Sequence, residues 1–131
     1  MLLEAKRYLI KQKWCAKIDE SYFGIGIGGI VAVFLFRITP SRNGVDGLVW
    51  VVVGDLPPLY ITVDNAPNPA CALDGYLGAM SEWAEAAIAG KSVSALPPVY
   101  AEPTPGNGRK LKKRLEFVDK EVLSRYRSDL S

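Results

Sequence analysis

The sequence predicts an α+β fold in a single domain over residues 1–131: a small three-stranded antiparallel sheet with an N-terminal helix and two C-terminal helices packed mainly on one face. Between residues 30 and 63, short runs rich in β-branched and aromatic residues alternate with turn residues, as in consecutive antiparallel strands. Segments with apolar residues three and four apart flank this region, as in amphipathic helices. A chain of this length can bury a core without disulfide or metal staples.

The first predicted element is a helix over residues 2–18. Its apolar side would carry Leu3, Ile10, Trp14 and Ile18, and lysines mark another side. The next run, Tyr22–Phe36, is uncharged over fifteen residues and holds four glycines. A membrane-spanning helix needs about 20 apolar residues, and glycine weakens a helix. We therefore expect no membrane span, and residues 22–29 are assigned to no particular element.

Three strands are predicted next, at Ile30–Ile38, Leu48–Val53 and Leu59–Val63. The turn dipeptides Asn43-Gly44 and Asp46-Gly47 indicate a hairpin between the first two. Between the second and third, Gly54-Asp55 supplies a turn, and Pro57-Pro58 cannot donate to a central ladder. The strands would form a meander whose first strand is an edge unless residues 22–29 pair with it.

Two helices are predicted in the C-terminal half. Asn68 is placed to cap the first, Pro69 to open it and Gly90 to end it. The second begins near Thr104 or Asn107 and continues to about residue 127. Its apolar side would carry Leu111, Leu115, Val118, Val122 and Tyr126.

The side chains needed for common catalytic and metal sites are scarce. The chain contains no histidine, and its two cysteines, Cys15 and Cys71, are far apart in sequence. A tetrahedral zinc site therefore has no plausible ligand set, and no nucleophile stands at a recognisable spacing from a base. We predict no catalytic residue, no metal, no cofactor and no enzymatic activity.

The run Gly24–Gly29 matches the spacing of a dinucleotide-binding loop. That loop lies between a strand and a helix whose N-terminus holds the pyrophosphate. Here β-branched and aromatic residues follow the glycines instead. The interpretation is a bend, a bulge or a close approach of another backbone segment.

Candidate recognition residues cluster around the turn that follows the second strand. Asp55 lies at the end of an apolar strand, where its carboxylate must meet water, a hydrogen-bond donor or a partner. The structural interpretation is that it bonds nearby amides and stabilises the turn. The functional one is that Trp50, Asp55 and Tyr60 form a recognition surface.

Basic residues gather at both ends of the chain, although the net charge is only +2. The cluster Arg109–Arg114 is interrupted by Leu111 and is explained by the outer side of an amphipathic helix. Binding of nucleic acid through this helix stays as the less favoured alternative. A homodimer is expected because a small sheet leaves open edges. The apolar flank of residues 73–88 is the alternative interface.

The strand, the turn and the first C-terminal helix resemble an uncharacterised family of small bacterial proteins, some of them similar to products of mobile gene cassettes of the integron type. The matching positions are Trp50, Gly54, Asp55, Leu56, Pro57, Tyr60, Pro69 and Trp83. The resemblance covers roughly residues 30–90. It implies an accessory protein and carries over no catalytic residue.

The function expected from the sequence is that of a non-enzymatic binding or interaction module. The alternative is a small-molecule-binding protein in which Trp14, Trp50, Trp83 and tyrosines line a pocket between sheet and helices. No apolar stretch of signal-peptide length follows Met1, so we expect a cytoplasmic protein with an unidentified protein or small molecule as its partner.

Overall fold

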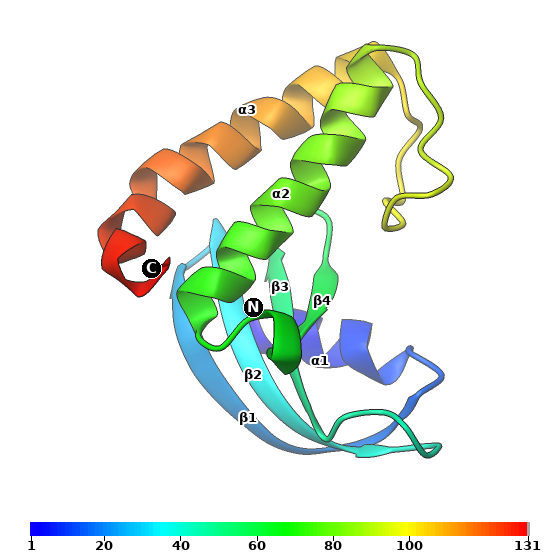
Figure 1. The fold of residues 1–131 in the computed structure, drawn as a ribbon, viewed down its shortest axis with the longest axis vertical. Coiled ribbons are helices and arrows are strands. Elements are labelled where there is room, and N and C mark those ends of the chain that lie inside the picture. Colours follow the sequence, from blue (N-terminus) through cyan, green and yellow to red (C-terminus); the bar gives the residue numbers. More distant parts are fainter. Residues whose placement is uncertain (131) are drawn as a thin grey trace.

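A four-stranded antiparallel sheet, in the order β1-β2-β3-β4, lies at the centre of the computed structural model, which describes residues 1–130. Its strands are β1 (Cys15–Ile27), β2 (Val31–Pro40), β3 (Leu48–Gly54) and β4 (Leu59–Thr62). The helices are α1 (Leu2–Ile10), α2 (Pro69–Ile88) and α3 (Pro105–Glu121), with short 3₁₀ segments η1 (Val63–Asn65) and η2 (Leu123–Leu130). The α+β class and the antiparallel meander are confirmed, but the sheet has four strands rather than three (Figure 1).

The additional strand, β1, replaces part of the predicted first helix. That helix ends at Ile10 instead of residue 18, and Ile18 lies in the strand. The pairing of β1 with β2 is irregular at three points, so its side chains do not alternate strictly between the two faces. Of the predicted apolar side, only Ile18 lies in this strand, and its separation of four residues from Trp14 is also that of one helical turn.

The long apolar strand β2 lies inside the sheet. Phe34 pairs with Phe23 of β1 on one side and with Val51 of β3 on the other. The segment Ile30–Ile38 was expected to be an edge unless residues 22–29 paired with it, and part of residues 22–29 does pair with it. The edges are β1 and β4.

Helices cover both faces of the sheet, which corrects the prediction that all three pack mainly on one face. Alternate residues of β2 and β3 point to opposite sides and are buried on both. Val33, Trp50 and Val52 pack in one cluster with α2 and α3. Phe34, Phe36 and Val51 pack in the other cluster with Ala5 and Leu9 of α1. Because the sheet is apolar on both faces, helices must cover each face to keep it from water.

The glycine-rich run forms the end of β1 and the turn into β2. Gly26 has a φ of 156°, and a Cβ atom there would lie 2.3 Å from the carbonyl oxygen of Val31. The close approach of a second backbone segment is thus the physical reason for this glycine. A strand rather than a helix follows the run, so the geometry of a dinucleotide-binding loop is not formed.

The caps of the two long helices agree with the predictions. The Asn68 side chain accepts a hydrogen bond from the Cys71 amide at 2.8 Å, and Pro69 begins α2. The Thr104 hydroxyl accepts one from the Asn107 amide at 3.1 Å and caps α3. The α-helical part of the last element ends at Glu121, earlier than expected, and continues as η2. None of the helices within residues 1–130 has the length and apolarity needed to cross a membrane.

Candidate functional site

The three candidate recognition residues do not share one surface. Trp50 is only 6% exposed, and its indole N–H donates a hydrogen bond to the carbonyl oxygen of Ala66 at 2.8 Å. Tyr60 pairs with Val51 and therefore points to the α1 side of the sheet. Asp55 lies in the turn between β3 and β4. Of the three, Trp50 serves the core, whereas Asp55 and Tyr60 reach two different hollows of the surface.

The tryptophans do not gather around a pocket between sheet and helices. Trp50 and Trp83 are buried in the cluster that joins the sheet to α2. Trp14 packs on the other side, where its ring meets that of Tyr60 edge to face at 4.8 Å between centroids. The aromatic pocket proposed from the sequence is therefore not formed by these three residues.

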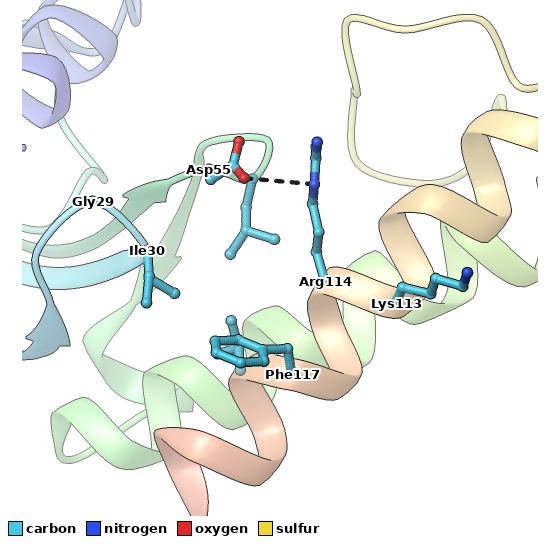
Figure 2. Close-up of a pocket in the computed structure, with 8 residues that line it drawn as sticks. Gly29, Ile30, Asp55, Lys113, Arg114 and Phe117 are labelled. Atoms are coloured by element: carbon cyan, nitrogen blue, oxygen red, sulfur yellow. Dashed lines mark ion pairs between the residues drawn. The ribbon is translucent and has the colours of Figure 1, made fainter.

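A surface pocket of about 340 Å³ opens beside Asp55, between α3 and the turns that join β1 to β2 and β3 to β4. We call it the Asp55 pocket. Figure 2 shows Phe117 of α3 below Ile30, with Asp55 and Arg114 above them at the rim. Its lining consists of Gly29, Ile30, Asp55, Leu56, Lys113, Arg114, Phe117 and Val118. The pocket thus combines an apolar floor with two cations and one carboxylate.

Backbone contacts between the two turns position Asp55 and Ile30. The Asp55 amide donates a hydrogen bond to the Ile30 carbonyl oxygen at 3.0 Å. A Cβ atom on Gly54 would lie 2.2 Å from that same oxygen, and the φ of Gly54 is 150°. Glycine at this position is what lets the two turns approach each other and build one wall of the pocket.

Helix α3 supplies the opposite wall. Leu111, Leu115 and Val118 are buried and hold the helix against the core. One helical turn separates Lys113 from Phe117, so the two side chains lie on the same side of α3, next to the pocket. Phe117 is 49% exposed, which is unusual for a residue of its size beside a well-packed core.

The charges of the pocket are only partly paired. Arg114 Nε lies 3.6 Å from Asp55 Oδ2, and both side chains are more than half exposed. Exposed ion pairs contribute about 0–1 kcal/mol, so this contact can be exchanged for another at little cost. Within residues 1–130, no carboxylate lies within ion-pair distance of Lys113. The rim therefore offers cationic hydrogen-bond donors to an anionic group.

The sequence predicts that the basic residues lie on the outer side of the last helix, but it does not reveal the Asp55 pocket. The one hint of the pocket in the sequence is Phe117, a large apolar residue among exposed charged positions. Its partners Ile30 and Leu56 come from turns that are far away in sequence. Only the pairing of β1, β2 and β3 brings these turns to α3.

Two buried or partly buried side chains have raised pKa values. Burial raises the pKa of the Cys15 thiol, which keeps it protonated and weakly nucleophilic. Burial also raises the pKa of Tyr8 to about 12. Among the described residues, no group of three or more histidine, cysteine or acidic side chains is arranged to hold a metal ion.

Comparisons with models of known protein families, with curated proteins and with solved structures found no significant match.

Proposed function

We propose that the protein is a non-enzymatic interaction module whose Asp55 pocket receives an acidic segment of a partner protein. The observation that carries this proposal is the position of Lys113 and Arg114 above an apolar floor that includes Phe117. An apolar side chain of the partner would enter the pocket, and a neighbouring carboxylate would meet the two cations. This role agrees with the accessory function implied by the resemblance.

The size of the pocket favours a side chain over a whole ligand. At about 340 Å³, it lies at the lower end of the range of about 300–1,000 Å³ for small-molecule sites. The pocket also opens along the solvent-facing side of α3. Protein interfaces use such hollows for one apolar anchor, surrounded by polar contacts.

The charge arrangement favours an acidic peptide over the nucleic-acid alternative. One cation of the cluster already has a close acidic neighbour in the protein, since Lys112 Nζ lies 2.8 Å from Glu85 Oε1. Binding to a phosphate backbone requires many unpaired cations, and its affinity scales with their number. A single carboxylate needs only one or two.

A pair of short peptides tests the proposal. We expect acetyl-Glu-Phe-Glu-amide to produce saturable NMR shifts at the amides of Gly29, Asp55 and Phe117. Its glutamine counterpart should bind more weakly, because it has no carboxylate for Lys113 and Arg114. Equal binding of the two peptides would contradict the charge requirement.

Substitutions in the protein complete the test. Phe117→Ala should lower the affinity for the glutamate peptide by about 1–2 kcal/mol, as expected for an apolar anchor. Lys113→Ala should lower it by about 0.2–1 kcal/mol. Ile10→Ala and Lys110→Ala are the matched controls, since neither residue lines the pocket and Ile10 is as exposed as Phe117. Unchanged affinity in Phe117→Ala would place the binding site elsewhere.

We also propose that two copies associate through β1. This strand is an edge of the sheet, and its second half, Ser21–Ile25, carries no charge. Tyr22 and Phe23 are exposed there, whereas Lys17, Asp19 and Glu20 protect the first half against pairing. Sedimentation equilibrium should show a concentration-dependent dimer that Phe23→Lys weakens. A mass that stays at 14.3 kDa at all concentrations would refute the proposal.

A further inference from the structure

A second groove, which we call the tyrosine groove, lies beside α1 at the edge of the sheet that β4 forms. One part of it, of about 380 Å³, is formed mainly by Tyr8, Tyr60, Tyr100, Pro58, Pro97 and Pro98. A wider hollow of about 710 Å³ continues it along α1 and shares Tyr8 and Tyr100 with it. Three aromatic rings and three prolines from distant parts of the chain thus meet along one groove.

The two proline segments of the groove have almost the same sequence. Residues 56–60 read Leu-Pro-Pro-Leu-Tyr, and residues 96–100 read Leu-Pro-Pro-Val-Tyr. The first leads into β4, whereas the second belongs to the irregular connection between α2 and α3. Pro97 and Pro98 line the same hollow as the three tyrosines. The protein itself therefore already places prolines beside these rings.

The hydrogen-bonding groups of the groove suit a segment that offers carbonyl oxygens. Burial raises the pKa of Tyr8 to about 12, so its hydroxyl keeps the proton and can donate it in a hydrogen bond. Gln12 Nε2 donates to the carbonyl oxygen of Tyr8 at 3.2 Å and has a second N–H. A proline-rich segment has few N–H groups and exposes mainly carbonyl acceptors, so it matches these donors.

Addition of a partner as a β-strand is disfavoured at this edge. Pro57 and Pro58 precede β4 and offer no N–H groups, and β4 itself has only four residues. An extended partner must therefore bind through its side chains and carbonyls, as a polyproline II helix does in aromatic grooves.

The charge at the end of the groove selects among proline-rich segments. Arg7 and Lys11 line the wider hollow together with a single acid, Glu4. Within residues 1–130, no carboxylate lies within ion-pair distance of either cation. An acidic residue next to the prolines would find an unpaired positive charge there.

We infer that the tyrosine groove binds a proline-rich, polyproline II segment of a partner protein that carries an acidic residue beside its prolines. Tyr100 is the principal contact, since this residue is 91% exposed and lines both hollows of the groove. Rigid proline walls and a preformed ligand helix both limit the conformational entropy lost on binding. This site is separate from the Asp55 pocket and does not depend on it.

The test uses acetyl-Asp-Pro-Pro-Leu-Pro-Asp-amide and a control in which alanine replaces each proline. We expect saturable NMR shifts at Gln12, Tyr60 and Tyr100 with the proline peptide and a clearly weaker response to the alanine peptide. Tyr100→Ala should reduce the affinity by about fivefold, as loss of one aromatic contact of about 1 kcal/mol predicts. Because Tyr100 is almost fully exposed, this variant should fold normally.

Tyr126→Ala is the control, because Tyr126 is also a tyrosine but lies in η2 and packs against the cluster on the α2 side, away from the groove. Its affinity for the proline peptide should equal that of the unmodified protein. Absence of saturable binding, equal binding of the alanine peptide or unchanged affinity in Tyr100→Ala would each overturn the inference. Shifts confined to the Asp55 pocket would do so as well.

Discussion

Both faces of the sheet are apolar, but the helices cover them unequally. On one face, the sheet packs against α2 and α3, which have 20 and 17 residues. On the other, it packs against α1, which has 9 residues and buries only Ala5 and Leu9 completely. Leu3 and Ile10 of α1 remain exposed, as does Phe23, which pairs with Phe34 on that same face. The α1 face therefore has apolar surface left over.

This difference separates the part of the protein that carries stability from the parts available for contacts. Burial of apolar area stabilises the fold by about 25 cal/mol per Å², and most large buried side chains face α2. Both proposed binding sites lie where helical cover ends. The Asp55 pocket lies at the margin of α3, and the tyrosine groove lies at the margin of α1.

The largest effect is expected on the α2 face. Trp83 is 2% exposed and packs in the cluster between α2 and the sheet. Trp83→Ala should lower the free energy of unfolding by about 3–5 kcal/mol, because it removes a large buried side chain and leaves a cavity. Urea denaturation measures this value. A loss below about 1 kcal/mol would mean that this face is not the better packed one.

A smaller and more local effect is expected on the α1 face. Leu9 is fully buried and is the main contact of α1 with the sheet. Leu9→Ala should cost about 2–3 kcal/mol, and hydrogen exchange should show α1 opening before the sheet does. If α1 and α2 instead lose protection together in this variant, the two faces unfold as one unit and the contrast between them fails.

Alkaline pH should act on the junction between α2 and the β3–β4 turn. The Tyr76 hydroxyl donates a hydrogen bond to the carbonyl oxygen of Pro57 at 2.5 Å, and burial raises the pKa of Tyr76. In the unfolded chain this pKa is about 10. Above that pH the unfolded state loses the proton that the folded state retains, so stability should fall as pH rises.

The slope assigned to Tyr76 should approach about 1.4 kcal/mol per pH unit. Tyr76→Phe cannot ionise and should show a shallower decline above pH 10, at a cost of about 1–2 kcal/mol near neutral pH for the lost hydrogen bond. Urea denaturation of both proteins between about pH 8 and 11 provides the comparison. Identical slopes would show that Tyr76 does not stay protonated in the fold.

The smallest effect is expected at the uncovered end of the α1 face. Phe23 is 63% exposed, and its ring meets that of Phe34 edge to face at 5.8 Å between centroids. Phe23→Ser should change the stability of the monomer by less than about 1 kcal/mol, since little area is lost from burial. Denaturation at low protein concentration, where any dimer dissociates, gives this value. A large loss would indicate that Phe23 is part of the core.

Local chemistry determined several features that can be found from the sequence alone. The start of α2 follows from Asn68 and Pro69, and that of α3 follows from Thr104. The apolar runs of β2 and β3 were recognisable because β-branched residues dominate them. Caps, turns and strand composition act over a few residues, so their physical causes are contained in short stretches of sequence.

Pairing between distant residues decided the rest. The bulges of β1 hide its alternation, so only its ladder with β2 identifies it as a strand and moves Ile30–Ile38 to the interior. The sequence shows that Asp55 and Tyr60 are near a turn, but not that they reach different sites on the molecule. Phe117 and Ile30 line one pocket, and Tyr8 and Tyr100 line one groove, only after the sheet and helices have packed. Such surfaces are built from side chains of several elements, and no local preference encodes which of these elements will become neighbours.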